Sequence, residues 1–234
     1  MSLKGKIAIV TGGTGALGVA IVRRFLAEGV KTTITVRTPQ DVLGAQELLG
    51  TEIASVPADV TVEQNVQRLF EEVRSKLGKI DIVVNTVGGF LPRKLIAEVS
   101  VEEWNRMMEM NLKSAFLCSR EALRSMKKQS YGRIVNISAM AAFNPAAGRA
   151  PYAISKFAIS MLADISAQEV KGTGTTINAI APSIIDTQAN RESMPNEDFA
   201  RWVKPEHIAD TICFLCSDAA SDISGTTLKM TGGI

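Results

Sequence analysis

The feature that most constrains the fold is a glycine-rich turn between a short apolar run and a helical pattern. Residues 7–10 form an apolar run typical of a buried strand. The turn that follows contains Gly12, Gly13, Gly15 and Gly18, and apolar residues then recur at helical spacing. Strand, turn and helix make up half of a dinucleotide-binding unit, in which the backbone and the helix N-terminus approach a pyrophosphate. A glycine pattern alone is weak evidence, so later motifs must support it.

Composition favours one domain spanning residues 1–234. With 234 residues, 46% of them hydrophobic, the chain can bury one large core. A net charge of +2 without a basic block argues against a nucleic acid partner. No apolar stretch reaches the roughly 20 residues that cross a bilayer, so no membrane partner is expected.

Cysteine and histidine usage narrows the class further. Three cysteines are too few for a disulfide framework, and the N-terminus leads directly into the first strand without a targeting peptide. We therefore expect a cytoplasmic protein. The single histidine, His207, excludes a two-histidine metal site, and no metal is expected.

Strand-like and helix-like segments alternate along the chain, which is typical of a parallel α/β sheet. Further strands are predicted over 31–36, 52–56, 80–84, 133–137, 176–180 and 227–230. Helices are predicted over about 111–128, 152–170 and 205–217, and two more begin at capping boxes, Thr61-x-x-Gln64 and Ser100-x-x-Glu103. The predicted fold class is α/β, with a doubly wound sheet covered by helices on both faces.

Polar and turn-forming residues gather at the carboxyl ends of these strands, where open parallel sheets bind ligands. The ends carry Thr11, Arg37, Asp59, Asn85 with Gly88, Ser138 and Pro182. Segment 183–204 is long, polar and interrupted by Pro195. A loop of that length in a compact domain is usually functional, so we predict a lid there.

Tyr152 and Lys156 are the candidates for proton transfer. Four residues apart on a helix, their side chains lie on one face. A nearby ammonium favours the phenolate and lowers a tyrosine pKa that is about 10 in water. An isolated Tyr-x-x-x-Lys is more often an ordinary surface pair, so the surrounding motifs decide.

In order along the chain, these motifs resemble the short-chain dehydrogenase/reductase family. The matching segments are Thr11-Gly12 to Gly18, Asp59-Val60, Asn85 to Gly88, Asn111, 132–136, Tyr152-x-x-x-Lys156, and Asn178 to Pro182 leading to Thr187. They cover almost the whole chain, and the resemblance implies a Rossmann-type, seven-stranded parallel sheet. Segment 186–202 is similar to the same region of dihydropteridine reductases and of bacterial short-chain reductases of unassigned substrate, so it indicates a branch and not a substrate. The branch resembles dihydropteridine reductase and bacterial carbonyl and 3-oxoacyl reductases.

The resemblance also implies roles. Tyr152 is then the acid/base, Lys156 holds the nicotinamide ribose, Asn111 positions a water in a proton relay, and Ser138 is the candidate serine that orients the substrate. Cofactor contacts are implied for the turn, the adenine site, the cleft and the nicotinamide site: Gly12, Thr14, Gly15, Leu17 and Gly18; Asp59 and Val60; Asn85 and Gly88; Pro182, Ile185 and Thr187.

Three segments depart from the family pattern. Ala16 replaces a glycine of the turn, and Thr86-Val87 stands where Asn-Ala is usual. Ser138-Ala139 stands where many members have two serines, of which the second is catalytic. If the strand stays extended to residue 139, Ala139 faces the site and Ser138 points away. Alternatively, the turn after Ile137 brings Ser138 into the site.

Cofactor choice depends on the end of the second strand. Enzymes that use NAD place an acid there to bind the ribose 2′-hydroxyl. Residues 30–38 contain no acid, and Arg37 and Thr38 occupy the position instead. A guanidinium pairs with a 2′-phosphate, so NADP(H) is expected to bind in preference to NAD(H).

The sequence thus predicts an NADP(H)-preferring oxidoreductase that transfers hydride between the nicotinamide and a small carbonyl or alcohol substrate. Quinonoid dihydropteridine reductase and 3-oxoacyl-carrier-protein reductase are the alternatives in this class. A non-catalytic NADP-sensing protein is the alternative of another class, favoured by Ala139 and opposed by Tyr152 and Lys156. The resemblance also implies a homodimer or homotetramer built on helices 111–128 and 152–170.

Overall fold

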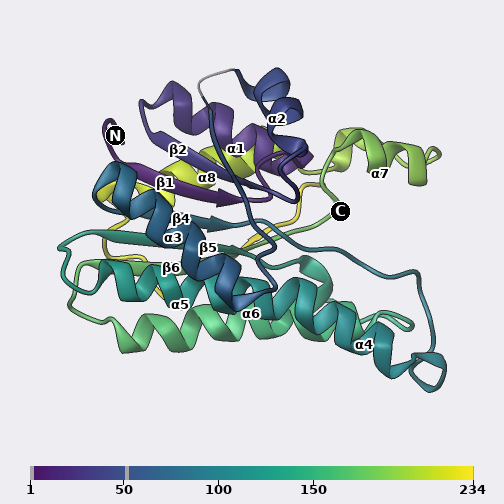
Figure 1. Ribbon diagram of the computed structural model, residues 1–234. Helices are drawn as coiled ribbons and strands as arrows, with labels where there is room; N and C mark the ends of the chain where they lie inside the picture. Colours follow the sequence, from purple (N-terminus) through teal and green to yellow (C-terminus); the bar gives the residue numbers. More distant parts are fainter. Residues whose placement is uncertain (1–2, 51–52, 234) are drawn as a thin grey trace.

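The computed structural model describes residues 3–50 and 53–233, which include a seven-stranded sheet. All strand pairs are parallel and the order is β3-β2-β1-β4-β5-β6-β7 (Figure 1). The strands are β1 (Ile7–Thr11), β2 (Lys31–Val36), β3 (Ala54–Pro57), β4 (Ile82–Asn85), β5 (Gly132–Ile137), β6 (Thr175–Pro182) and β7 (Thr227–Met230).

Helices cover both faces of the sheet, as Figure 1 shows. One face packs against α1 (Ala16–Ala27), α2 (Asp41–Leu49) and α8 (Pro205–Cys216). The other packs against α3 (Glu63–Leu77), α5 (Ser114–Met126) and α6 (Ala150–Glu169). The predicted doubly wound α/β fold is therefore confirmed.

Strand β1 shows why the central strands are continuous apolar runs. Ala8 and Val10 pack into the core under α1 and α8, while Ile7 and Ile9 pack into the core under α3 and α5. A strand covered on both faces does not alternate between polar and apolar residues, whereas a strand with one face in solvent does. The same reasoning applies to β4, all four residues of which are buried.

The predicted boundaries agree closely with most of the elements. The strands predicted over 31–36 and 227–230 agree residue for residue with β2 and β7. The strand predicted over 52–56 is found as β3, and its first predicted residue lies outside the described residues. The capping box at Ser100 is confirmed, because Ser100 Oγ accepts from the Glu103 N–H (3.2 Å) and Glu103 Oε2 accepts from the Ser100 N–H (2.9 Å).

The capping box predicted at Thr61 is wrong. Helix α3 begins after Val62 without a side-chain cap. Thr61 is held instead by Asp59, whose Oδ1 accepts from the Thr61 N–H (2.9 Å) and hydroxyl (2.7 Å). A short-range turn at the end of β3 thus competes successfully for the threonine that the helix would use.

The helix predicted from Asn111 does not begin there. Helix α4 (Val101–Met107) runs into α5 through a π-helical turn, Met108–Lys113, with Asn111 inside it. The Ser114 N–H bonds to the Glu109 carbonyl, five residues back. Such a turn inserts one extra residue into a helix and is frequent at functional sites.

The predicted lid is partly folded. It contains α7 (Gln188–Ser193), which projects beyond the carboxyl ends of the strands (Figure 1), and its two ends meet in a β-bridge between Ile185 and Val203. Trp202 is buried and its ring lies 4.7 Å from that of Phe199. Among the described helices, none is long and apolar enough to cross a bilayer.

Candidate active site

The turn between β1 and α1 has the backbone that its glycines permit. Gly12 adopts φ +65°, and a Cβ on Gly18 would lie 2.3 Å from the Gly12 carbonyl oxygen. Thr14, Gly15 and Ala16 are exposed, and Leu17 is half-buried. Gly15 precedes α1 without a side-chain cap, so the first N–H groups of the helix are open to a ligand.

Arg37 and Asp59 follow the neighbouring strands β2 and β3 on this edge. Arg37 is exposed, with no ion pair to any of the residues described. Asp59 is exposed too, and one of its oxygens is engaged by Thr61. Val60 is buried in the core beneath the sheet, so only its backbone is available to a nucleotide. Of the two residues expected to contact an adenine, only Asp59 therefore offers its side chain.

At the centre of the sheet, amides join the ends of β4 and β5. Asn85 Nδ2 donates to Asn136 Oδ1 (2.8 Å) and to Ser119 Oγ (3.2 Å). Thr86, which replaces the usual asparagine, donates its hydroxyl to the Thr11 carbonyl, and its N–H bonds to Thr11 Oγ1 (3.1 Å). The substitution thus leaves the ends of β1 and β4 tied together.

The loop after β4 is joined to α6 through Asn111. Asn111 Oδ1 accepts from the Gly89 N–H (2.8 Å), and Asn111 Nδ2 donates to the Gly89 carbonyl (3.1 Å) and to Ser155 Oγ (2.9 Å). Ser155 donates in turn to the Tyr152 carbonyl (2.8 Å). The loop, the π-helical turn and the first turns of α6 are therefore one connected unit.

Gly88 lies between the side chains of Asn111 and Lys156. A Cβ at this position would lie 2.8 Å from Asn111 Oδ1 and 3.0 Å from Lys156 Nζ. Any larger residue would fill the space beside both polar groups. A cradle of this kind, next to an open helix N-terminus, fits a nicotinamide dinucleotide lying across the carboxyl ends of the strands.

Burial shifts the pKa values of Lys156 and Tyr152 in opposite directions. The Lys156 ammonium donates to the Ile137 carbonyl (2.8 Å), and burial lowers its pKa to about 8. Burial raises the pKa of the Tyr152 phenol, and the guanidinium of Arg149 acts in the opposite direction. The predicted lowering of the tyrosine pKa by Lys156 is therefore wrong for this structure, in which burial is the larger effect.

Ser138 does not join this group. Its Oγ donates to the Lys156 carbonyl (2.7 Å) and accepts from Ser160 Oγ (3.0 Å), so it is buried against the backbone of α6. Ala139 continues in an extended conformation, with φ −160°. The structure thus has the first of the two predicted arrangements, with Ser138 turned away, and it does not support Ser138 as a residue that contacts the substrate.

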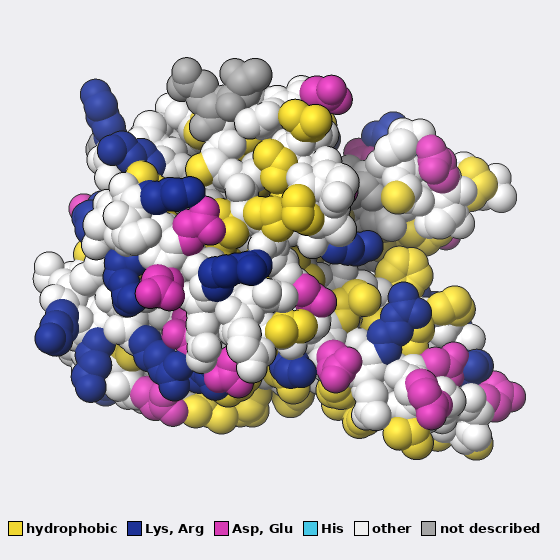
Figure 2. Space-filling model, in the orientation of Figure 1, with side chains coloured by type: hydrophobic (Ala, Val, Ile, Leu, Met, Phe, Trp, Pro, Cys, Tyr) yellow, Lys and Arg dark blue, Asp and Glu magenta, His cyan; other side chains and the backbone are white. Residues whose placement is uncertain are grey.

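The residues expected near the nicotinamide lie at the base of the lid. Pro182 ends β6 and is buried. The Ile185 carbonyl accepts from Asn190 Nδ2 (2.8 Å), and Thr187 Oγ1 accepts from the Asn190 N–H (3.2 Å) as the cap of α7. In this bond the Thr187 hydroxyl oxygen accepts, so its O–H can still donate to a ligand. Figure 2 shows an open hollow between the α7 segment and the part of the molecule that carries α4.

Two residues of the site were not predicted from the sequence. Ser155 is fully buried between Asn111 and Tyr152. Its position between Tyr152 and Lys156 in the sequence could have indicated that it belongs to the site. Arg149 lies three residues before Tyr152, and its effect on the phenol appears only when the start of α6 is known.

Comparison with known proteins agrees with this geometry. The family described as short chain dehydrogenase matches residues 6–198. The 3-oxoacyl-[acyl-carrier-protein] reductase FabG of Salmonella typhimurium is 32% identical, over 100% of this chain and 99% of that protein. A Bacillus subtilis protein named "Uncharacterized oxidoreductase YvrD" is also 32% identical, over 100% of this chain and 98% of its own length.

Solved structures are similar over nearly the whole fold. A short-chain type dehydrogenase/reductase from Mycobacterium ulcerans has a TM-score of 0.92 and 28% identity, covering 100% of this chain and 90% of that one. A structure of ElxO with NADP bound has a TM-score of 0.91 and 27% identity, covering 97% and 98%. This chain therefore belongs to the short chain dehydrogenase family and is an NAD(P)-dependent oxidoreductase.

Proposed function

We propose that the chain reduces a small carbonyl substrate with NADPH, using Tyr152 as the proton donor. The observation that supports this most is the unit in which Asn111 ties the Gly88–Gly89 loop to the helix carrying Tyr152 and Lys156. In this proposal the proton donor, the cation and the cofactor cradle share one connected support. Preorganised support of this kind is what hydride transfer requires.

When bound, a nicotinamide cofactor would supply the hydride that reduces the carbonyl carbon. Tyr152 gives its proton to the carbonyl oxygen, and burial keeps the phenol protonated until the transfer. The Lys156 ammonium, which donates to the Ile137 carbonyl in the structure, would hold the ribose hydroxyls of the cofactor. Asn111 holds a water through which the phenol regains its proton. Hydride and proton together convert the carbonyl to an alcohol.

NADPH is the proposed cofactor because Arg37 stands at the position where an NAD enzyme has an acid. Arg37 is exposed and forms no ion pair with any described residue. The similar ElxO structure also holds NADP. Replacing Arg37 with aspartate should weaken NADPH binding by about ten- to a hundredfold and reverse the preference over NADH, because a charge-assisted pair becomes a repulsion. Fluorescence titration of both reduced cofactors measures this, and equal dissociation constants in the unmodified protein would refute it.

Ala139 leaves the site without the usual serine, and we expect this to restrict the substrates. A positioned hydrogen-bond donor is worth about 10²–10³ in rate. Ala139→Ser should therefore raise kcat/KM on simple ketones, while Ser138→Ala should change kcat little and cost about 1–3 kcal/mol of stability by removing buried hydrogen bonds. A hundredfold loss of kcat in Ser138→Ala, at unchanged cofactor binding, would show that the serine contacts the substrate.

Two narrower activities are alternatives. The names of several relatives favour reduction of 3-oxoacyl groups on a carrier protein. The missing serine favours polarised substrates such as quinonoid pterins. Oxidation of NADPH with simple ketones, 3-oxoacyl thioesters, quinones and a quinonoid pterin separates these possibilities.

We also propose a homodimer or homotetramer assembled through α6. Its exposed apolar side chains recur on one helix face: Ile154, Phe157, Met161 and Ile165. A second copy of the chain covers such a stripe with the same stripe, as two-fold symmetry requires. Ile165→Glu should lower the mass seen by sedimentation, whereas Leu43→Glu, on exposed α2, should leave it unchanged. A monomeric unmodified protein would contradict the proposal.

The three cysteines are unpaired and buried. This fits the reducing cytoplasm in which we propose that the enzyme works.

A further inference from the structure

We infer that Arg149 selects substrates that carry an anionic group, so that the carbonyl compound reduced by this chain is an oxo acid. The inference rests on the proposed function, since it assigns the substrate class of the same site. It starts from the position of Arg149 directly before α6, three residues from Tyr152. Positions three apart at the start of a helix lie on one face, and the Arg149 guanidinium is near enough to lower the pKa of the Tyr152 phenol.

Backbone contacts hold Arg149 between α6 and the loop that follows β4. Gly148 adopts φ +79°, and its carbonyl accepts from the Lys94 N–H (3.0 Å) of the loop that follows Gly88 and Gly89. A Cβ on Gly148 would lie 3.2 Å from the Arg93 Cβ, so this loop packs directly against the turn before α6. Arg149 is half-buried, with its backbone fixed between the loop and the helix.

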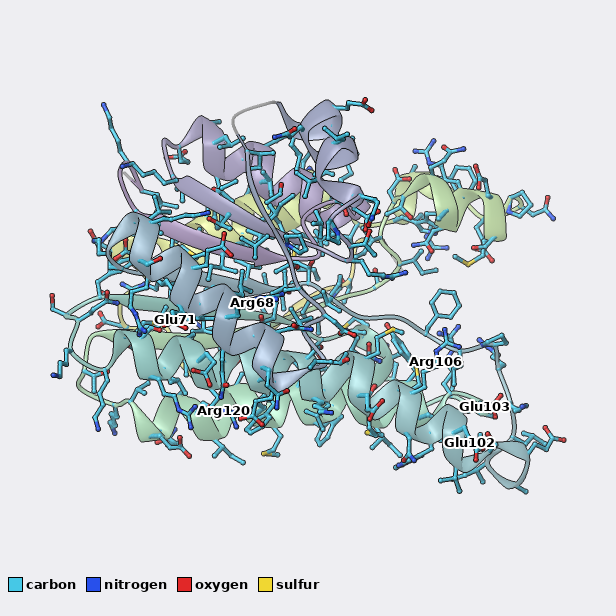
Figure 3. The ribbon with its side chains drawn as sticks, in the orientation of Figure 1. Arg68, Glu71, Glu102, Glu103, Arg106 and Arg120 are labelled. Atoms are coloured by element: carbon cyan, nitrogen blue, oxygen red, sulfur yellow. The ribbon has the colours of Figure 1, made fainter. Side chains whose placement is uncertain are left out.

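Two of the cations around the site, Lys94 and Arg191, form ion pairs, whereas Arg149 forms none with any described residue. Lys94 forms an ion pair with Glu103 (2.6 Å), a residue of α4 that Figure 3 shows near the same loop. Across the hollow, Arg191 pairs with Asp186 through two bonds of 2.6 and 2.8 Å. Within residues 3–50 and 53–233, Arg149 has no ion pair and no side-chain hydrogen bond, and its neighbour Arg93 has no ion pair.

An unpaired, half-buried guanidinium beside a proton donor is suited to a carboxylate. Arginine presents a planar fork that binds carboxylate oxygens in pairs, and partial burial strengthens the interaction. With Ala139 and Ser138 unable to orient the substrate oxygen, a second anchor on the substrate is needed to bring the carbonyl to Tyr152. Arg149 is the positioning residue that supplies this anchor.

The test compares acids with amides of the same skeleton. Pyruvate, acetoacetate and levulinate, each paired with its primary amide, vary the spacing between carbonyl and charge. In the unmodified enzyme we expect at least one acid to exceed its amide in kcat/KM by about ten- to a hundredfold, the effect of a hydrogen bond to a charged partner. Arg149→Met should remove this ratio mainly through KM for the acid, and Arg149→Lys should restore part of it.

Arg74→Met is the matched control, because Arg74 is an exposed cation on α3 and its loss should leave the acid-to-amide ratio unchanged. Calorimetric binding of the same acids and amides to the NADPH complex is measured in parallel. Turnover of acids and amides alike, with a ratio near one, would overturn the inference and leave the reductase intact. Absence of turnover with preferential, Arg149-dependent binding of an acid would contradict the proposed reaction and support the anion site. Equal binding of acids and amides would overturn the inference.

Discussion

Replacing Tyr152 with phenylalanine is expected to lower kcat by about 10²–10⁴ and to leave the dissociation constant for NADPH unchanged, because the phenol acts as a general acid. The substitution removes one oxygen, while the backbone carbonyl that Ser155 uses is retained. Steady-state kinetics on the best substrate from the panel gives kcat, and fluorescence titration gives the NADPH affinity.

Tyr131 is a suitable control, since the chain has two tyrosines. The Tyr131 hydroxyl donates to the Cys216 carbonyl. Tyr131 lies just before β5, at the opposite end of that strand from Ser138. Tyr131→Phe should lower the melting temperature and keep kcat. Near-normal kcat in Tyr152→Phe would require another proton donor.

Replacing Lys156 with methionine is expected to weaken NADPH binding by about ten- to a hundredfold, through loss of charged hydrogen bonds, and to reduce kcat as well. The ammonium donates to the Ile137 carbonyl, and a Cβ on Gly88 would lie 3.0 Å from it. Because its pKa is about 8, the unmodified enzyme should lose NADPH affinity as the pH rises through 8, and the variant should not.

Stability gives a second readout for Lys156. The folded chain releases the ammonium proton at about pH 8, whereas the unfolded chain keeps it up to a pKa of 10.5. The unfolded state therefore binds more protons between these values, so stability should rise with pH across this window. Urea titrations should show the rise in the unmodified protein and in the exposed control Lys128→Met, and a smaller rise in Lys156→Met. An identical pH dependence in all three would contradict the burial of a charged lysine.

The parts predicted best from the sequence are those in which local pattern and tertiary packing agree. The apolar run before Gly12 is found as β1, because a strand buried on both faces leaves an unbroken apolar pattern. The strand at 31–36 is found as β2, whose threonine, isoleucine and valine residues favour strands. The Ser100 capping box is confirmed for a similar reason, since both of its hydrogen bonds are local.

The remaining features depend on contacts that no short window contains. The π-helical turn at Asn111 shifts the hydrogen-bond register without altering the apolar pattern. The direction of Ser138 is set by the Lys156 carbonyl and Ser160, which lie in another element. The influence of Arg149 on Tyr152 depends on where α6 begins, and helix boundaries are the least regular part of a sequence pattern.

Transfer of deuterium from NADPH labelled at the transferable position to a carbonyl substrate tests the proposed function most directly. Mass spectrometry of the product reports both the reaction and the path of the hydride. We expect the alcohol to carry one deuterium on the former carbonyl carbon, formed by the unmodified enzyme and by Tyr131→Phe but scarcely by Tyr152→Phe. An alcohol without the label would contradict direct hydride transfer. Equal amounts of labelled alcohol from all three proteins would contradict Tyr152 as the proton donor.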